Sequence, residues 1–532
     1  MTDERLTSPL RKRAAAQPRA PAVEFEGRTW SYGVLLDAIE EAKRALGELG
    51  VRAGDRVLIV NENAPEVLAF LFAAGELDAW PVPVNARLTG IEIDRIAGHC
   101  QPRRIIYASG SSRAAAEHAA AAAATGLHRP LLGTFSVSPE DPLAEPEPVP
   151  PATADRIAVM FYTSGTTGIP KGVMVSHRNI RAQGDAMVSL RGFVPGDRAY
   201  CMLPLSYIGG FAILLVPALF AGACVVLEQR FTPQRIARQL AEGRVSAILG
   251  APAFYEKLYA WVSNGGRLRA PRLRLALCGT SPLNRARKRA IEGMLGVPLH
   301  NSYGLTETTC GVCQTLLGLP REDDSVGQPV QGIELRIVDP EGRNVDEGVV
   351  GEIIVRGAKV FPGYYRDPEE TWKVLSSDGW FATGDLGYRA PSDAAYPGDI
   401  YLSGRKKEVI KRLGYLVHPV EVEMVLREHT GVVQCAVVGR SAGPDEDIVA
   451  FVQPVPDAKL STSDLARFLA ERLTPYKRPR RIVLVDLLPL LNSGKVDKAA
   501  LKDMAAKDGS AATWAFEASG EATRVAIARR RG

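Results

Sequence analysis

Apolar runs of strand length alternate with helical patterns through most of this chain. Residues 57–60 form such a run before a helical pattern over 64–77, and residues 247–249 form another before a pattern over 254–262. This alternation is typical of βαβ units, in which parallel strands form a sheet and the helices lie outside it. Because 532 residues exceed what one hydrophobic core supports, we expect at least two domains.

The pattern changes after about residue 324, where short strands separated by turns predict a small barrel-like or antiparallel region. Beyond residue 404 the chain becomes a compact unit of helices and strands, and its last stretch lacks periodicity. The fold class we expect is α/β: a large N-terminal domain of two stacked α/β subdomains plus a small barrel-like β subdomain, followed by a small mobile α+β domain. The predicted bounds are 1–403 for the large domain, 404–504 for the small domain and 505–532 for a loosely ordered tail.

Composition argues against several classes of protein. The formal net charge of +5 is small for this length, so we expect no nucleic-acid partner. No apolar run reaches the roughly 20 residues that a membrane helix needs, and residues 1–13 contain no signal core. Seven cysteines, an odd and sparse set, fit a reducing compartment better than a disulfide framework, and we expect a cytoplasmic protein. Cys310 and Cys313 form a CxxC pair, but a second pair or a histidine cluster is missing, which argues against metal or redox use.

The segment from Thr163 to Lys171 packs hydroxyls, glycines and one lysine into a single turn after a predicted buried strand at 157–161. Glycine lets backbone N–H groups approach an anion closely, hydroxyls add donors, and lysine adds a mobile positive charge. The segment therefore predicts a loop for a polyphosphate. It is not a Walker A loop, because Lys171 is followed by Gly172 rather than by Ser or Thr. The alternative is a flexible surface loop, against which the ordered spacing of Pro170 and Lys171 argues.

A second polar turn, at residues 301–307, follows a strand-like run at 297–299. Open α/β sheets bind ligands at the carboxyl ends of their strands, so we expect this turn to face the same site as the phosphate loop. Tyr303 offers a ring for a base, Thr306 a hydroxyl for a phosphate, and Glu307 a hard oxygen ligand for Mg²⁺. The alternative is an ordinary surface turn.

Three further features extend the pattern. Asp385, after a tight turn, has enough acceptor sites for both hydroxyls of a ribose, although an Asx-turn would use the same side chain. A charge run at 404–411 lies at the predicted domain boundary, where a solvated hinge is the simpler interpretation. Lys495 follows a Ser-Gly turn on a predicted projecting tip, from which a mobile domain can bring an ammonium group to a reacting phosphate. Most exposed lysines have no such role.

The order and content of these motifs resemble those of the adenylate-forming superfamily, which includes acyl-CoA synthetases, adenylation domains and firefly luciferase. The resemblance covers residues from about 10 to 502, and the charged hinge is most similar to that of luciferase and of aryl- and acyl-CoA ligases. It implies an AMP-forming acid–thiol ligase that uses ATP and Mg²⁺. A small-molecule carboxylic acid would become an acyl-adenylate with release of pyrophosphate, and a thiol, by default CoA, would then displace AMP.

The same motifs fit three alternatives. A stand-alone adenylating enzyme would load a carrier protein or couple the adenylate to another nucleophile, and a luciferase-like enzyme would oxidise it. A nucleotide-binding regulatory protein would have lost its chemistry, but Lys171, Glu307, Asp385 and Lys495 are all present, which argues against that reading. Thioester formation from acid, ATP and either CoA or a carrier protein separates the CoA ligase from the carrier-loading enzyme.

The resemblance implies a role for each motif residue. Around the nucleotide these would be Thr163, Ser164, Gly165, Thr166, Thr167, Gly168 and Lys171 on the β- and γ-phosphates, Tyr303 on adenine, Thr306 on the α-phosphate, Glu307 on Mg²⁺, Asp385 on the ribose, and Arg405 elsewhere on the nucleotide. The C-terminal domain would rotate about Lys407. It would bring Lys495 for adenylation and then present the face from Lys411 to Gly414 for the thioester step.

The resemblance also implies where the acid binds. The inferred wall consists of Tyr207, Gly210, Phe211, Ala251, Tyr255, Cys278, Gly279, Thr280, Ser281, Gly304, Leu305 and Gly311. Tyr207 departs from the family pattern, because many relatives carry there a histidine that gates the acyl pocket. Residues 206–211 contain no Asp or Glu to pair with an α-ammonium group, so we expect an acid without one. Aromatic and small residues alternate along the wall, which favours a medium-sized aryl or alkyl acid.

Lys407→Pro tests the hinge that the resemblance implies. A proline stiffens the backbone there, so we expect acyl-adenylate formation to continue and thioester formation to stop. Pyrophosphate exchange and CoA-thioester yield, measured on one preparation, report the two half-reactions. A parallel loss of both would contradict a mechanism with two domain orientations.

Overall fold

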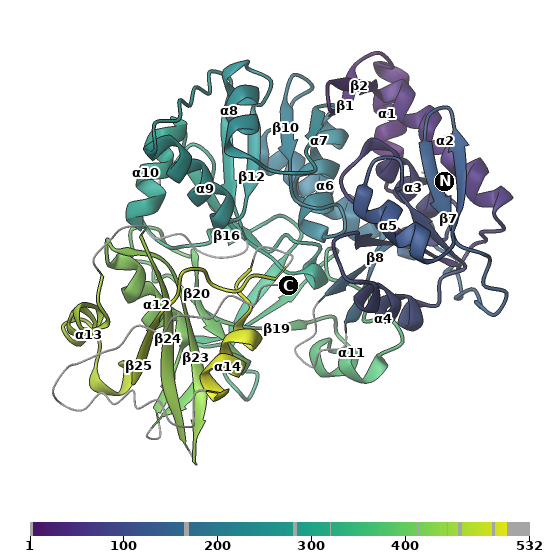
Figure 1. The fold of residues 1–532 in the computed structure, drawn as a ribbon. Coiled ribbons are helices and arrows are strands. Elements are labelled where there is room, and N and C mark those ends of the chain that lie inside the picture. Colours follow the sequence, from purple (N-terminus) through teal and green to yellow (C-terminus); the bar gives the residue numbers. More distant parts are fainter. Residues whose placement is uncertain are drawn as a thin grey trace.

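Two α/β lobes lie side by side (Figure 1): the first contains the strands between residues 56 and 137, and the second those between residues 198 and 303. The C-terminal elements lie below the second lobe. The structure is a computed structural model that describes residues 4–163, 170–279, 285–319, 321–412, 415–443, 445–455, 460–491 and 495–507. Within these ranges no helix is both long and apolar enough to cross a membrane. All seven cysteines are free thiols.

The second lobe is built on the nine-stranded sheet β16-β15-β14-β13-β12-β10-β11-β1-β2. Its five central strands pair in parallel, namely β10 (Arg198–Cys201), β11 (Cys224–Leu227), β12 (Ala247–Gly250), β13 (Leu275–Cys278) and β14 (Leu299–Tyr303). One face packs on α8 (Pro233–Ala241), α9 (Pro252–Ser263) and α10 (Arg285–Leu295), and the other on α6 (His177–Arg191) and α7 (Val216–Ala221). Because helices cover both faces, the strands are short, and β11, β12 and β13 are wholly apolar. The outer strands are β1 (Pro21–Phe25), β2 (Arg28–Ser31), β15 (Cys313–Gln314) and β16 (Gln328–Pro329).

The first lobe contains the sheet β4-β3-β5-β7-β6. Its strands are β3 (Arg56–Asn61), β4 (Trp80–Asn85), β5 (Arg104–Tyr107), β6 (Thr125–Arg129) and β7 (Gly133–Val137). Helix α3 (Pro65–Glu76) is buried on nearly every side and belongs to a hydrophobic cluster that joins both large sheets, together with α1 (Ser8–Ala16) and α2 (Tyr32–Glu48). Helices α4 (Gly90–Cys100) and α5 (Arg113–Ala121) cover the opposite face. The predicted α/β fold class is confirmed.

A four-stranded antiparallel sheet follows, as the short strands after residue 324 predict. It consists of β17 (Glu334–Val338), β18 (Gly351–Arg356), β19 (Phe381–Arg389) and β20 (Ile400–Arg405), with α11 (Pro368–Val374) before β19. Strand β19 was not predicted, because its glycines and aspartate are poor strand formers. Its pairing with β18 on one side and β20 on the other holds it in place. Strand β19 carries Asp385.

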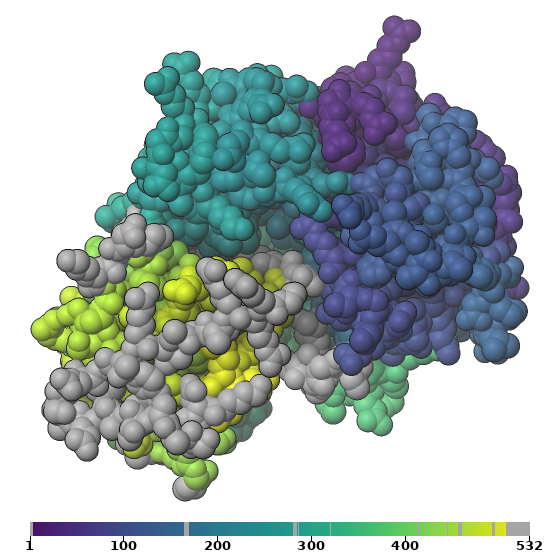
Figure 2. All heavy atoms as spheres, in the orientation of Figure 1, coloured from purple at the N-terminus to yellow at the C-terminus, as the bar shows by residue number. Residues whose placement is uncertain are grey.

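The C-terminal elements have hydrophobic clusters of their own. The hairpin β21 (Ile410–Arg412) and β22 (Tyr415–Val417) leads to the sheet β23 (Val432–Ala442), β24 (Asp445–Pro454) and β25 (Arg481–Leu484). Helices α12 (Pro419–Glu428) and α13 (Thr462–Ala470) pack on one face, and α14 (Lys498–Lys507) packs on the other. These elements meet the second lobe (Figure 2). The boundary at residue 404 stays a prediction, and the part of the predicted tail beyond residue 507 lies outside the described residues.

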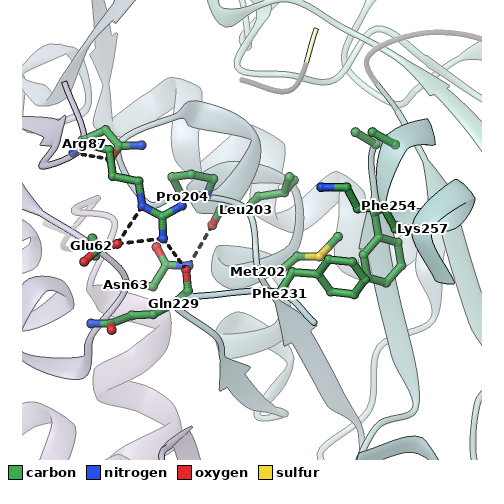
Figure 3. Close-up of a pocket in the computed structure, with 13 residues that line it drawn as sticks. Glu62, Asn63, Arg87, Met202, Leu203, Pro204, Gln229, Phe231, Phe254 and Lys257 are labelled. Atoms are coloured by element: carbon green, nitrogen blue, oxygen red, sulfur yellow. Dashed lines mark hydrogen bonds and ion pairs between the residues drawn. The ribbon is translucent and has the colours of Figure 1, made fainter. Parts of the chain in front are cut away.

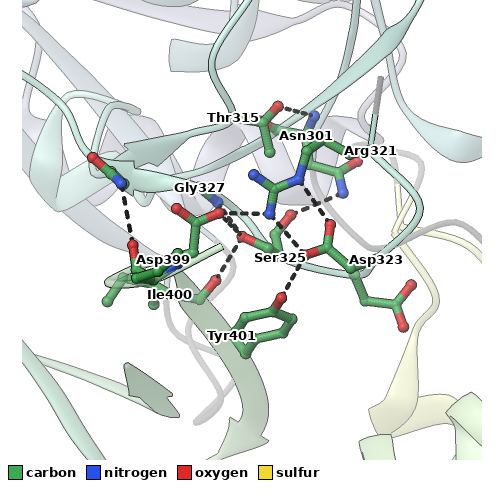
Figure 4. Close-up of polar contacts among 12 residues, drawn as sticks. Asn301, Thr315, Arg321, Asp323, Ser325, Gly327, Asp399, Ile400 and Tyr401 are labelled. Carbon is green, nitrogen blue, oxygen red and sulfur yellow. Dashed lines mark hydrogen bonds and ion pairs between the residues drawn. The ribbon is translucent and has the colours of Figure 1, made fainter. Parts of the chain in front are cut away.

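A buried polar network joins the main sheet to the four-stranded sheet (Figure 4). Arg321 donates to Asp399 at 2.6 Å and to Asp323 at 3.0 Å, and the Ser325 hydroxyl donates to Asp399 at 2.9 Å. The Asn301 amide on β14 donates to the Ser325 carbonyl at 3.0 Å. Arg321 holds the pKa of Asp323 below its usual range despite burial. The network therefore fixes the end of β14 relative to the start of β20.

Arg321→Met should lower the free energy of unfolding by about 3 kcal/mol, because it leaves the buried Asp399 carboxylate without its cation. Urea unfolding followed by tryptophan fluorescence measures the change. Arg113→Met is the matched control: its pair with Glu117 is exposed, and its loss should cost less than about 0.5 kcal/mol. Equal effects of the two substitutions would contradict a structural role for the network.

Candidate active site

The two ends of the predicted phosphate loop lie at the end of a β-hairpin. Strand β8 (Ile157–Thr163) pairs with β9 (Lys171–Ser176), and Thr163 is the register partner of Lys171. Ser164, Gly165, Thr166, Thr167 and Gly168 lie outside the described residues. Lys171 Nζ lies 2.5 Å from Glu370 Oε2 and 4.9 Å from the centre of the Tyr364 ring. The ammonium group lowers the pKa of Glu370 to about 2.

Tyr303, Asp385 and Arg405 come together from three strands. The Tyr303 hydroxyl, at the end of β14, donates to Asp385 Oδ2 at 2.7 Å, and Arg405 Nε lies 2.9 Å from Asp385 Oδ1. Asp385 and Arg405 are register partners on β19 and β20, and Asp385 is 5% exposed. A carboxylate has about four acceptor sites, so Asp385 keeps capacity for further donors. Stacking of Tyr303 on a base stays a prediction.

Thr306 and Glu307 lie in the 3₁₀ turn Thr306–Thr308, which follows β14. Glu307 Oε1 accepts a hydrogen bond from the Tyr364 hydroxyl at 2.9 Å, and the Glu307 carbonyl accepts one from the Phe361 N–H at 2.8 Å. Tyr364 therefore connects the turn to Lys171. Sequence reasoning missed Tyr364 and Glu370, which lie about two hundred residues beyond the loop. The adjacent tyrosines after the 357–363 segment were the one available signal.

Lys495 reaches this site from the C-terminal part of the chain. Desolvation by the surrounding protein lowers the pKa of Lys495, the positive charge of Arg405 lowers it further, and Asp385 and Glu307 oppose the shift. Its ammonium group therefore lies within electrostatic reach of three predicted site residues. Asn492, Ser493 and Gly494, the turn that should present Lys495, lie outside the described residues.

The structure places Lys411 elsewhere. It lies on β21, which packs against β23 and β24, and its backbone N–H donates to Glu446 at 2.8 Å. Its side chain is exposed, and Gly414 lies outside the described residues. A role for Lys411 in the thioester step stays a prediction that requires another arrangement of this part of the chain.

The residues of the predicted acid wall lie in different surroundings. Phe211 and Tyr255 are fully buried in hydrophobic clusters, and the Tyr255 hydroxyl donates to the Leu277 carbonyl at 2.7 Å. A Cβ at Gly210 or Gly304 would lie 2.4 Å from a backbone atom, so close packing requires glycine at both, and a Cβ at Gly311 would lie 2.2 Å from Gln183 Oε1. The remaining wall residues are Tyr207, Ala251, Cys278, Gly279 and Leu305, whereas Thr280 and Ser281 lie outside the described residues. Burial raises the pKa of Tyr207 to about 12, and a hydrogen bond with Asn85 partly offsets the shift.

A cavity of about 220 Å³ opens at the carboxyl ends of strands from both large sheets (Figure 3). Ala251 is the predicted wall residue that lines it. Glu62 and Arg87 form an ion pair at 2.7 Å on its wall, and Asn63 donates to the Leu203 carbonyl at 3.0 Å. The full lining is Glu62, Asn63, Asn85, Arg87, Met202, Leu203, Pro204, Gln229, Phe231, Ala251, Ala253, Phe254 and Lys257. Because these residues come from loops far apart in sequence, no local motif predicted them.

Comparison with known proteins agrees with this geometry. Residues 10–365 match the family model of the AMP-binding enzyme, and residues 421–495 match that of the AMP-binding enzyme C-terminal domain. The chain is 31% identical over 503 residues to a feruloyl-CoA synthase of Amycolatopsis sp, covering 92% of this chain and 97% of that protein. It is 31% identical over 519 residues to the indoleacetate–CoA ligase of Aromatoleum aromaticum, covering 93% and 97%. The structure of ATP-bound MatB from Rhodopseudomonas palustris superimposes with a TM-score of 0.81 at 27% identity, covering 94% of this chain and 99% of that chain.

Asp385→Asn should raise the KM for ATP by about 10- to 100-fold, because the ribose would lose a charge-assisted hydrogen bond. Steady-state pyrophosphate release at varied ATP measures it. Asp393→Asn, at an exposed loop position, is the control and should leave the KM unchanged. An unchanged KM in Asp385→Asn would remove this carboxylate from the nucleotide site.

Proposed function

The chain belongs to the family of AMP-binding enzymes, and on that premise we propose how its residues divide the reaction between them. The protein is an AMP-forming acid–thiol ligase of the acyl-CoA synthetase type. It activates a carboxylic acid with ATP, releases pyrophosphate, and passes the acyl group from the acyl-adenylate to the thiol of CoA. The observation that carries the assignment of roles is the meeting of Tyr303, Asp385 and Arg405, and the charges of Asp385 and Arg405 also act on Lys495.

Electrostatic stabilisation is the main chemical need of the first step. When a carboxylate attacks the α-phosphorus, negative charge grows on a centre already surrounded by anionic oxygens, so cations and alignment dominate catalysis. Lys495 would stabilise that charge, and Asp385 with Tyr303 would fix the nucleoside. Lys171 would bind the β- and γ-phosphates and exchange its contact with Glu370 for one with phosphate.

Glu307 fits the role of a Mg²⁺ ligand. Mg²⁺ in nucleotide enzymes is held by one or two carboxylates plus phosphate oxygens and water. One Glu307 oxygen accepts from Tyr364, and the other is available to a metal. Groups of three or more metal-ligating side chains are absent from the described residues, which agrees with a metal held mainly by ATP. Bound there, Mg²⁺ would neutralise phosphate charge.

The hinge at Lys407 is supported by the anchoring of its neighbours. Lys406 Nζ lies 2.8 Å from Glu352 on β18, whereas Glu408 lies 2.7 Å from Lys498 on α14. Lys498 also lies 3.0 Å from Glu423 on α12, so Glu408 is tied to the C-terminal elements. Lys407 thus lies between one residue held by the large domain and one held by the small domain. We propose that the small domain beyond Lys407, up to residue 504, rotates as a unit about this point.

Lys495→Ala should slow acyl-adenylate formation by about 10²–10³-fold, the scale of losing one strong charge-stabilising donor. Acid-dependent exchange of labelled pyrophosphate into ATP measures this step alone. Lys502→Ala, exposed on α14, is the matched control and should exchange at the wild-type rate. Wild-type exchange by Lys495→Ala would refute the assigned role.

A panel of alkyl and aryl acids, with pyrophosphate release as the readout and product mass with CoA as the second, tests the function itself. Acid-dependent release followed by an acyl-CoA product is expected. Release without any acyl-CoA would favour a carrier protein or another nucleophile as acceptor.

A further inference from the structure

Four long polar side chains lie buried behind Gly311, a residue of the predicted acid wall. Gln183 and Arg191 come from α6, Gln314 from β15, and Lys359 from the segment before Tyr364; we call these four the inner polar cluster. Each is at most 2% exposed. Arg191 Nε donates to Gln314 Oε1 at 3.1 Å, and the Gln183 amide is packed so closely on Gly311 that a Cβ there would lie 2.2 Å from Gln183 Oε1.

Most donors of the inner polar cluster have no partner. Lys359 Nζ, Gln314 Nε2 and both amide atoms of Gln183 lack a hydrogen bond to any residue in the described part of the chain. Leaving a buried donor unpaired costs about 1–3 kcal/mol, and a buried charge costs more. A purely structural role does not explain this, because apolar side chains of the same volume would fill the space at lower cost.

The inner polar cluster also has an excess of positive charge. Arg191 donates to the Gln314 amide oxygen and to the Ile213 carbonyl, so its described partners are neutral. Among the described residues no carboxylate forms an ion pair with Lys359 or Arg191. Burial, together with the charge of Arg191, lowers the pKa of Lys359 to about 7, and Cys313 partly opposes the shift. Two cations and three unpaired amide or ammonium donors together describe a site for an anion.

The inner polar cluster adjoins the reaction site. Burial raises the pKa of Cys310, which precedes Gly311, and the charges of Lys495 and Arg191 both oppose that shift. Cys310, Leu305 and Ile213 pack against the main hydrophobic cluster and are only partly buried, unlike the four side chains behind them. An acid whose carboxylate faces Lys495 would direct its far end toward Gly311.

We propose that the acid carries a second anionic group, a carboxylate or a sulfonate, and that Lys359, Gln183 and Gln314 donate to this group at the end of the acid pocket. This inference rests on the proposed function, and it names the substrate class. The expected substrates are acids with an anion at each end. Proteins that break the rule of satisfied buried polar groups do so mainly at functional sites. A site built to hydrogen-bond a polar group rejects analogues that lack it by up to about 10⁴-fold.

The test compares matched acids, hexanoate with adipate and 3-phenylpropanoate with 3-(4-carboxyphenyl)propanoate. For the wild type, kcat/KM for pyrophosphate release should favour the acid with two carboxylates in at least one pair. Lys359→Met should reduce that preference by about 10- to 100-fold, as expected for the loss of a charged hydrogen bond. Lys502→Met, the exposed control, should keep the wild-type preference.

Proton uptake gives a second readout. The groups that act on Lys359 are Arg191 from α6 and Cys313 from β15. With a pKa of about 7, Lys359 is mostly neutral at pH 8 in the free enzyme, and a bound anion would favour its charged form. Calorimetry in buffers of different ionisation enthalpy should therefore find uptake of nearly one proton per adipate at pH 8 and little at pH 6. Lys359→Met should show no such uptake.

The outcomes separate this inference from the proposed function. Equal use of both acids of each pair, or an unchanged preference in Lys359→Met, would overturn the inference and leave the ligase activity intact. If no acid releases pyrophosphate, the thermal unfolding midpoint decides: adipate should raise it more than hexanoate in the wild type but not in Lys359→Met, and equal shifts would overturn the inference. Misfolding is not expected to obscure the result. Because the unfolded lysine binds a proton more readily than the buried one, Lys359→Met should raise the midpoint at pH 7, by less as the pH approaches 10.

Discussion

The Asp385 carboxylate is the interaction on which the site depends. One oxygen accepts from Tyr303 at the end of the parallel sheet, and the other pairs with Arg405 at the start of the hinge. Three parts of the protein are therefore positioned by one buried acid. The buried network around Arg321 and Asp399 supports this arrangement, because Asn301 on β14 donates to Ser325 and Ser325 donates to Asp399 beside β20. A nucleotide bound at Asp385 would therefore lie beside Tyr303 of the large domain and beside Arg405 at the start of the predicted hinge.

Buried charge follows two patterns in this molecule. Several buried charges that maintain the fold have a counter-charge: Asp399 has Arg321, and Glu423 has both Lys498 and Arg427. In the inner polar cluster, Lys359 has none among the described residues. Because an unpaired buried cation is costly, this contrast supports the proposed anion site at Lys359.

Short sequence patterns predicted the elements that are determined by their own residues, such as the buried strands. The apolar runs at 247–249 and 57–60 form parallel strands, because a short continuous apolar run is typical of a strand that is covered on both faces. Strand β19 was missed because neighbours rather than propensity hold it. The motif residues Tyr303, Asp385 and Arg405 do meet, and Glu307 contacts Tyr364 instead. Sequence reasoning did not find Tyr364, Glu370 or the inner polar cluster, because sequence does not show which polar side chains are buried or which distant loops meet.

The position of the label after ATP cleavage tests the central claim most directly. With ATP labelled at the γ-phosphate and an acid substrate present, cleavage between the α- and β-phosphates is expected, so the label should appear in pyrophosphate as AMP forms. Label released as inorganic phosphate, with ADP as the other product, would contradict the claim that Lys495 and Asp385 direct attack at the α-phosphorus.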